Sequence, residues 1–166
     1  MVGHHQYFGS NRTIMQACIS ADNDVVVVDR NCHKSIEQGL MLTGAKPVYM
    51  VPSRNRYGII GPIYPQEMQP ETLQKKISES PLTKDKAGQK PSYCVVTNCT
   101  YDGVCYNAKE AQDLLRKTSD RLHFDEAWRG LCTFQPDLCQ SLLPCAANTG
   151  NTTVLLFSPP TPPTNC

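Results

Sequence analysis

The chain has 166 residues, a length that fits one domain with a buried core. Its formal net charge is +1, so the composition does not indicate a nucleic-acid or membrane-surface partner. No apolar run is long enough to cross a bilayer, and the first residues lack the apolar core of a signal peptide, which together predict a cytoplasmic protein.

Strand-like and helix-like patterns alternate along the chain. They predict strands at 25–28, 48–51, 93–96, 121–124 and 153–157, helices at 35–43, from 70 onward and from 107 to about 117, and loops at 53–65 and 84–91. The valine run that starts at Val25 is typical of a strand buried on both faces. Gly44 is expected to stop the first of these helices, and Asn107 with Glu110 makes a capping-box-like start for the last one.

This order of elements predicts an α/β fold, with a mostly parallel sheet and helices on its faces. The proline-rich residues 158–166 lack the backbone donors that a central strand or a helix needs, so an extended tail is expected there. Ligands of open α/β sheets bind at the carboxyl ends of strands. Asp125, which ends the strand at 121–124, is therefore a predicted cofactor-binding residue.

Nine cysteines are spread along the chain, and no two of them form a Cys-x-x-Cys pair. Structural zinc sites use such close pairs, so no metal site is predicted. We interpret most of the cysteines as small buried side chains. A cysteine-based metal or redox module is the alternative that a metal assay on the reduced protein would test.

Several motifs, in consistent order over residues 10–134, resemble the major domain of the ornithine/lysine/arginine decarboxylases. They are found at residues 29–35, 43–45, 47–49, 58–63, 97–103, 106–107 and 123–128. The resemblance implies the aspartate-aminotransferase-type large domain (fold type I) over residues 1–157, with pyridoxal 5′-phosphate as cofactor. It also implies a lyase that removes carbon dioxide from a basic amino acid to give a polyamine-pathway amine, and leaves open which of the three is the substrate.

The resemblance assigns roles to five residues. The carbanion left by decarboxylation needs the cofactor ring as an electron sink, and Asp125 would keep the ring nitrogen protonated. His33 would stack on the ring, Ala127 and Trp128 would line its surroundings, and Ser10 would remain from the edge of the phosphate site. The alternatives are an Asp125 that caps the next turn, a His33 that starts a helix or sits in the core, and a Trp128 that fills core space.

Residues 97–103 follow another predicted strand and belong to the same resemblance. Residue types in this segment leave individual roles open, because a tight turn closed by Asp102 and Gly103 explains the same residues. Lys34 follows His33 directly, but the resemblance does not make it the lysine that forms a Schiff base with the cofactor.

Two departures from the family pattern concern the chemistry. Residues 6–13 run through Gly9 and Ser10 without the family's Gly-Thr-Ser-Thr-type phosphate loop. The expected lysine belongs to a Ser-x-His-Lys-type motif after the aspartate, but the corresponding residues 158–163 contain no lysine, and the last lysine is Lys117. The chain is therefore expected to be an inactive fragment of a decarboxylase. The alternative is a non-catalytic partner of an intact decarboxylase subunit, and a homo-oligomer is also possible for this family.

Overall fold

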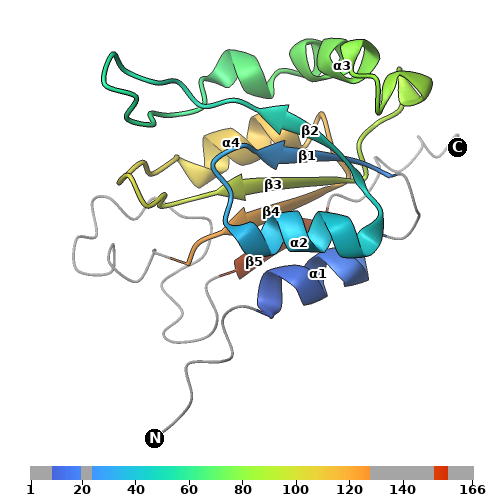
Figure 1. Ribbon diagram of the computed structural model, residues 1–166, viewed down its shortest axis with the longest axis horizontal. Coiled ribbons are helices and arrows are strands. Elements are labelled where there is room, and N and C mark those ends of the chain that lie inside the picture. The colour runs from blue at the N-terminus through green and yellow to red at the C-terminus, as the bar shows by residue number, and fades with distance from the viewer. Residues whose placement is uncertain (1–8, 20–23, 128–151, 157–166) are drawn as a thin grey trace, which may run out of the picture.

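The computed structural model describes residues 9–19 and 24–127, together with the backbone of 152–156 (Figure 1). Its elements are α1 (Ser10–Cys18), β1 (Val25–Asp29), α2 (Lys34–Thr43), β2 (Lys46–Met50), the short 3-10 helix η1 (Pro65–Met68), α3 (Pro70–Glu79), the short 3-10 helix η2 (Lys84–Lys86), β3 (Tyr93–Thr97), α4 (Ala108–Leu115), β4 (Arg121–Asp125) and β5 (Thr152–Leu156).

The strands form one sheet in the order β2-β1-β3-β4-β5. β1, β2, β3 and β4 are mutually parallel, and β5 runs antiparallel to β4. The mostly parallel sheet predicted from the sequence is confirmed. Because Thr97 of β3 is level with Asp125 of β4, the carboxyl ends of these two strands meet at one edge of the sheet.

Helices cover both faces of the sheet, as predicted. Val26 and Val28 of β1 pack in a cluster with Met15 of α1 and Ile36 of α2. Val27, between them, packs in the cluster on the opposite face, which includes residues of α3 and α4. Successive side chains of a strand point to opposite faces, so a strand covered on both sides needs an unbroken apolar run.

Two predicted helix signals are confirmed by local geometry. Gly44 ends α2 in the left-handed conformation, with φ of 66°, where a residue without Cβ is favoured. The Asn107 side chain accepts hydrogen bonds from the backbone N–H groups of Lys109 and Glu110, and so caps α4.

Helix α1 was not predicted from the sequence. It packs closely along α2, where a Cβ added at Gly39 would lie 2.5 Å from Met15 Sδ. The absence of a side chain at Gly39 therefore allows the buried Met15 to pack against α2. This contact joins the two helices whose first residues lie at the candidate site.

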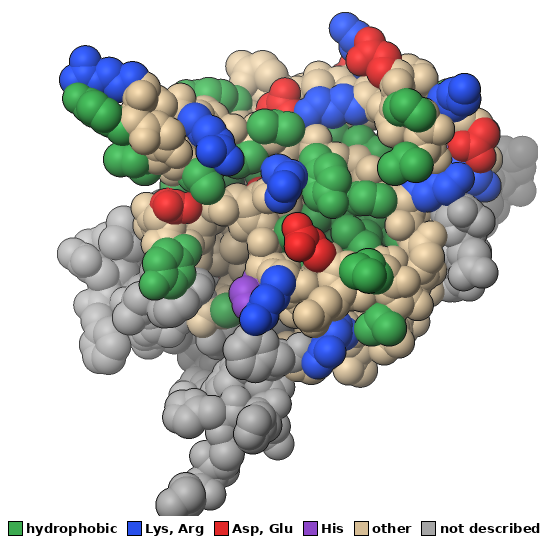
Figure 2. All heavy atoms as spheres, in the orientation of Figure 1, with side chains coloured by type: hydrophobic (Ala, Val, Ile, Leu, Met, Phe, Trp, Pro, Cys, Tyr) green, Lys and Arg blue, Asp and Glu red, His purple; other side chains and the backbone are tan. Residues whose placement is uncertain are grey.

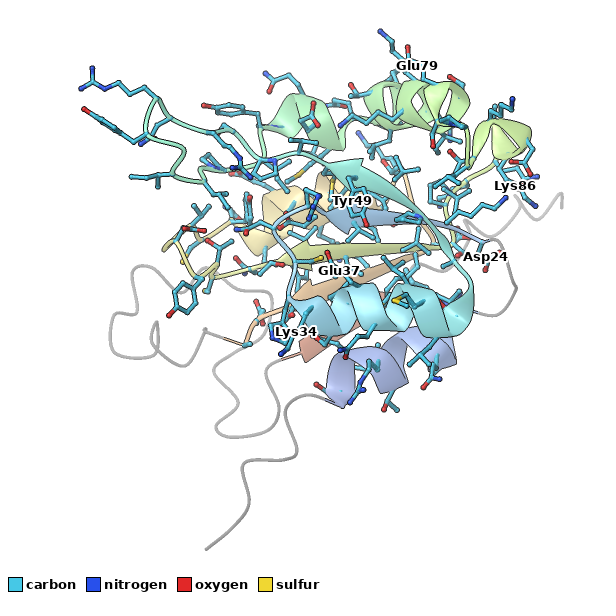
Figure 3. The ribbon with its side chains drawn as sticks, viewed as in Figure 1. Asp24, Lys34, Glu37, Tyr49, Glu79 and Lys86 are labelled. Carbon is cyan, nitrogen blue, oxygen red and sulfur yellow. The ribbon has the colours of Figure 1, made fainter. Side chains whose placement is uncertain are left out.

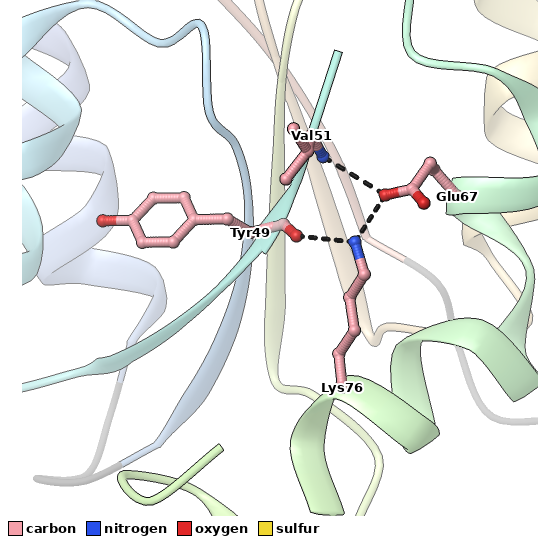
Figure 4. Close-up of polar contacts among 4 residues, drawn as sticks. All are labelled: Tyr49, Val51, Glu67 and Lys76. Carbon is pink, nitrogen blue, oxygen red and sulfur yellow. Dashed lines mark hydrogen bonds and ion pairs between the residues drawn. The ribbon is translucent and has the colours of Figure 1, made fainter. Parts of the chain in front are cut away.

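The outer edge of β2 is covered by side chains from η1 and α3 (Figure 4). Lys76 Nζ donates to the backbone oxygen of Tyr49 (3.1 Å), and Val51 N–H donates to Glu67 Oε2 (3.3 Å). Lys76 and Glu67 also form an ion pair. Burial raises the pKa of Glu67, but its hydrogen bonds from Lys76 and Val51 and the Lys76 charge outweigh burial and lower it. Paired edge groups are unavailable for strand addition by another chain.

The face of the molecule in Figure 2 carries basic and acidic side chains intermixed. This agrees with the near-neutral formal charge of the chain. Among residues 9–19 and 24–127, no helix is long and apolar enough to span a membrane.

Candidate functional site

The candidate site lies at the edge of the sheet where β1, β3 and β4 end. Figure 1 shows that α1 and α2 begin on the side toward which these strand arrows point. Lys34, the first residue of α2, marks this side in Figure 3. This arrangement brings the start of α1, the start of α2 and the end of β4 together, although they are far apart in sequence.

Asp125 is the buried acid at the end of β4. Its Oδ2 accepts a hydrogen bond from Asn11 Nδ2 (2.8 Å), and its Oδ1 accepts one from Ala127 N–H (3.3 Å). The second contact is the turn-capping role that the sequence left as an alternative for this residue. The first contact is a long-range one, which fixes the carboxylate against the first turn of α1.

Burial raises the pKa of the Asp125 carboxyl above its usual range, and the Glu126 charge acts in the same direction. The hydrogen bonds from Asn11 and Ala127 and the charge of His33 oppose this shift. A desolvated carboxylate becomes more stable when an opposite charge is placed next to it. The end of β4 is therefore suited to bind a cationic group, and a buried acid with a perturbed pKa at a strand end is a functional-site candidate.

His33 caps the start of α2. Its Nδ1 accepts a hydrogen bond from Ser35 N–H (3.2 Å) and lies 2.8 Å from Ser35 Oγ. His33 is therefore a helix-start residue, as the alternative described, and its stacking role stays a prediction. The side chain is also exposed, so capping leaves the ring accessible at the edge of the site.

Asn11 and Ser35 connect the two predicted site residues, and sequence reasoning missed both. The buried Asn11 side chain donates to Ser35 Oγ (2.9 Å) as well as to Asp125. Asp125, Asn11, Ser35 and His33 thus form a continuous chain of polar contacts from β4 to α2. The one sequence signal for Asn11 is its position next to Ser10, at the edge of the missing phosphate loop.

The remaining predicted site residues lie at the same edge of the sheet, except Trp128, which is outside the residues that the structure describes. Ser10 is the first residue of α1 and is half-buried beside Asn11. Ala127 is exposed and contacts Asp125 through its backbone N–H. Trp128 lies outside the described residues, as do residues 6–8 and 158–163 of the two departures from the family pattern. The structure thus brings Ser10, His33, Asp125 and Ala127 to one edge.

Two further buried acids, Asp29 and Glu126, hold the ends of strands in place. Asp29 accepts hydrogen bonds from the backbone N–H groups of Asn31 (2.7 Å) and Thr97 (3.3 Å), and burial raises its pKa to about 6. Glu126 Oε1 accepts from Asn98 Nδ2 (3.0 Å). Because side chains alternate along a strand and Val28 packs on the side of α1 and α2, Asp29 points away from the face of Asp125. The two acids tie β1 to β3 and β3 to the end of β4.

His123, another titratable residue of the sequence motif, belongs to the core. Its Nδ1 lies 2.6 Å from the Tyr93 hydroxyl, and burial lowers its pKa to about 4. It is therefore neutral at physiological pH and contributes to packing between β3 and β4. Within residues 9–19 and 24–127, no group of three or more His, Cys, Asp or Glu side chains is placed to hold a metal ion.

A family model described as Orn/Lys/Arg decarboxylase, major domain, matches residues 7–159. The biodegradative arginine decarboxylase of Escherichia coli strain K12 is 93% identical over 128 residues, which are 77% of this chain and 17% of that protein. The lysine decarboxylase LdcA of Pseudomonas aeruginosa is 43% identical over 125 residues, or 75% of this chain and 16% of LdcA. The chain thus spans about a sixth of the length of these relatives.

Solved structures give the same match. The crystal structure of the Francisella novicida lysine decarboxylase LdcF superposes with a TM-score of 0.66 at 40% identity, covering 80% of this chain and 17% of that one. Lysine decarboxylase A from Pseudomonas aeruginosa gives a TM-score of 0.65 at 43% identity, covering 72% and 16%. The predicted fold class agrees with these matches.

Proposed function

Because the chain belongs to the Orn/Lys/Arg decarboxylase family, we propose that it is part of the cofactor-binding domain of a pyridoxal-phosphate-dependent decarboxylase of basic amino acids. The proposed substrate of the complete enzyme is arginine. This choice is supported by the 93% identity to an arginine decarboxylase, against 43% to a lysine decarboxylase. The proposed domain extends over residues 1–157, with residues 158–166 as a tail.

One observation carries the proposal: Asp125 is buried at the end of β4 and held by Asn11 at the start of α1. When bound, the cofactor ring would accept the electron pair that the departing carbon dioxide leaves on the substrate. Asp125 would hold a proton on the ring nitrogen, and its raised pKa favours pairing with that cation. His33 would cover one face of the ring and exclude water from it.

The phosphate end of the cofactor would lie near Ser10. Backbone N–H groups at the start of a helix attract anions, and α1 begins at this residue. Asn11 would then orient Asp125 from the same helix turn, so the residue near the phosphate and the residue that orients the acid would come from one helix. Ala127 and Trp128 are proposed to line the surroundings of the ring.

The chain by itself is proposed to be inactive. The sequence has no lysine after Lys117, so residues 158–163 cannot supply the covalent attachment that the family uses. Loss of a covalent nucleophile usually lowers a rate by several orders of magnitude. Binding without attachment would still be possible, because the residues that surround Asp125 remain.

Cofactor trapping tests the proposal. The purified chain is titrated with pyridoxal phosphate, followed by visible absorbance, and then reduced with borohydride for mass-spectrometric mapping of lysines. We expect saturable binding that Asp125→Asn weakens by about tenfold, equivalent to about 1.4 kcal/mol, and labelling that is scattered over the lysines. Asp113→Asn is the matched control, because this acid is exposed on α4. Equal affinity of the Asp125→Asn variant, or one lysine labelled to saturation, would overturn the proposal.

A non-catalytic role as the partner of an intact decarboxylase subunit is the second proposal. The missing lysine supports it, because such a chain could join an assembly without adding an active site. Co-expression with an active arginine decarboxylase and affinity purification of this chain would test it. Recovery of the intact subunit in stoichiometric amount is expected, and recovery of this chain alone would exclude the role.

A further inference from the structure

The loop that follows β3 is a small hairpin held by its own hydrogen bonds. Thr100 N–H donates to the Val104 oxygen (2.9 Å), and Val104 N–H donates to Thr100 Oγ1 (3.1 Å). Gly103 closes the turn, with φ of 84° and an N–H that donates to the Thr100 oxygen. This confirms the tight turn predicted as an alternative for this segment. Residues 100 and 104 are therefore held opposite each other.

Asn98 fixes the base of this hairpin. Its Oδ1 accepts hydrogen bonds from Cys99 N–H (3.1 Å) and Tyr106 N–H (2.9 Å), one on each side of the loop. Its Nδ2 is bound to the buried Glu126. The backbone segments at 98–99 and 105–106 are thus clamped together by one side chain, which is itself anchored to the end of β4.

Cys99 and Cys105 lie between the Asn98 clamp and the 100–104 pair. Their Sγ atoms are 3.5 Å apart. A disulfide has an S–S distance of about 2.05 Å, so an approach of roughly 1.5 Å would join them. Cys105 is exposed, whereas Cys99 is 7% exposed and has a φ of 60°. The exposed thiol can meet a reagent from solvent, and the buried one lies beside it.

We propose that Cys99 and Cys105 are an oxidisable dithiol. When a peroxide oxidises it, the two cysteines form an intramolecular disulfide. The Cys105 thiolate attacks one peroxide oxygen, the O–O bond breaks, and Cys105 becomes a sulfenic acid while one water is released. Cys99 sulfur then attacks the Cys105 sulfur, the S–S bond forms, and the hydroxyl leaves as a second water after protonation. The two thiols lose two electrons, and one hydrogen peroxide is reduced to two waters.

Other described cysteines are less suited to this reaction. Cys94 is fully buried in the core, and burial strongly raises the pKa of its thiol. Burial, aided by the charges of Glu37 and Asp29, raises the pKa of Cys32 to about 12. Thiolates are the reactive form, so both react slowly at neutral pH. The Cys99–Cys105 spacing matches no familiar sequence motif, and the hairpin that pairs the two residues appears only in the fold.

The hairpin also contacts the connection between β1 and α2. Asn31, which lies two residues before His33 in this connection, donates from Nδ2 to Asp102 Oδ2 (3.3 Å). Oxidation would therefore constrain a loop next to the candidate site. In a reducing compartment the dithiol is the resting form, and the disulfide is a transient product. The proposed modification depends on the positions of the two thiols and does not require cofactor binding.

Peptide mapping tests the proposal directly. The reduced full-length chain is treated with substoichiometric hydrogen peroxide, alkylated, and cleaved with chymotrypsin without reductant. Cleavage after Tyr101 falls between the two cysteines, so the peptides on either side stay joined only through a disulfide. We expect a joined product whose mass is two hydrogen atoms below the summed masses of the two reduced peptides. Groups tied by a short loop have an effective concentration on the order of millimolar, so at a protein concentration of about 1 micromolar this product should exceed dimers roughly a thousandfold.

Variants identify the sulfurs. Cys99→Ser and Cys105→Ser should each abolish the joined peptides, and the matched control Cys32→Ser should leave their yield unchanged. Because Cys105 is exposed, its substitution tests the proposal even if Cys99→Ser impairs folding. Joined peptides that persist in Cys105→Ser, a predominance of intermolecular dimers, or sulfinic acid at Cys105 without joined peptides would each overturn the proposal.

Discussion

At the scale of single residues, the candidate site depends on Asn11. Its amide group donates to both Asp125 and Ser35, and these two residues lie 114 and 24 positions away in sequence. A buried donor with two partners fixes the relative position of the groups that it joins. Asn11 is therefore a positioning residue for the acid, and it sets the orientation of Asp125 before any ligand arrives.

Asn11→Leu should raise the pKa of the Asp125 carboxyl further, because the variant removes a hydrogen bond that favours the charged form. It should also lower the free energy of unfolding by about 1–3 kcal/mol, since a buried acceptor loses its partner. Carbon-13 NMR titration of the aspartate carboxyls and urea unfolding would measure the two effects. Gln38→Leu, at an exposed position of α2, is the control. An unchanged Asp125 titration in Asn11→Leu would contradict the assignment.

Asp29 should make stability depend on pH. Its pKa is about 6 in the folded chain, above the unfolded value of about 3.9. The folded state therefore holds the proton on Asp29 more tightly than the unfolded state does. The resulting contribution of Asp29 to the free energy of unfolding is full below pH 4, falls as the pH rises to about 6, and stays low above that pH. The loss is on the order of 2–3 kcal/mol. The free energy of unfolding should change less between pH 4 and pH 7 in Asp29→Asn than in wild type or Asp113→Asn. An equal change in all three proteins would refute this account.

At the scale of secondary-structure elements, the Lys76–Glu67 pair attaches η1 and α3 to the edge of β2. Both side chains are partly buried. Lys76 also contacts the backbone oxygen of Tyr49 in β2, and Glu67 accepts from the backbone N–H of Val51, which follows β2. A double-mutant cycle with Lys76→Met and Glu67→Gln should give a coupling energy above about 1 kcal/mol. The exposed Lys75–Glu79 pair on α3 should give about 0.3–0.5 kcal/mol. Equal coupling in the two cycles would mean that the edge pair is no stronger than an exposed ion pair.

The sequence predicted those elements whose signals are local. The valines of β1, the Gly44 stop of α2 and the Asn107 cap of α4 each specify their structure within a few residues. Helix α1 was missed because its packing depends on a tertiary contact. Its Met15 occupies the space left by the absent side chain of Gly39, a residue of α2. Element type was therefore predictable where pattern and cap agree, and not where burial depends on a tertiary contact.

The candidate site shows the same division. Asp125 was predicted because a strand pattern ended in an acid, and His33 because of the family motif. The connecting role of Asn11 and Ser35 could not be predicted from the sequence, since their contacts form only when α1, α2 and β4 meet. The Cys99–Cys105 pair was overlooked for a similar reason, because its proximity comes from the hairpin.

At the scale of the whole molecule, the site and the sheet are inseparable. Asp125 comes from a central strand, its partner Asn11 comes from α1, and Asn11 in turn contacts Ser35 of α2 on the same face. Binding at this edge should therefore stabilise the fold as a unit. At a cofactor concentration about a hundredfold above Kd, the free energy of unfolding should rise by about 2.7 kcal/mol. Calorimetry with and without pyridoxal phosphate would measure the rise, and no rise under saturating conditions would contradict a single cooperative unit.

The most direct test of the central claim is the protonation state of the bound cofactor's ring nitrogen. Pyridoxal phosphate labelled with nitrogen-15 in the ring would be added to the chain, and the nitrogen chemical shift would be recorded by NMR. A buried Asp125 carboxylate should keep this nitrogen protonated above the pH at which it loses its proton in water. We expect the protonated shift in the wild-type chain and the unprotonated shift in Asp125→Asn. The same shift in both proteins would contradict the assignment of Asp125 as the residue that binds the ring.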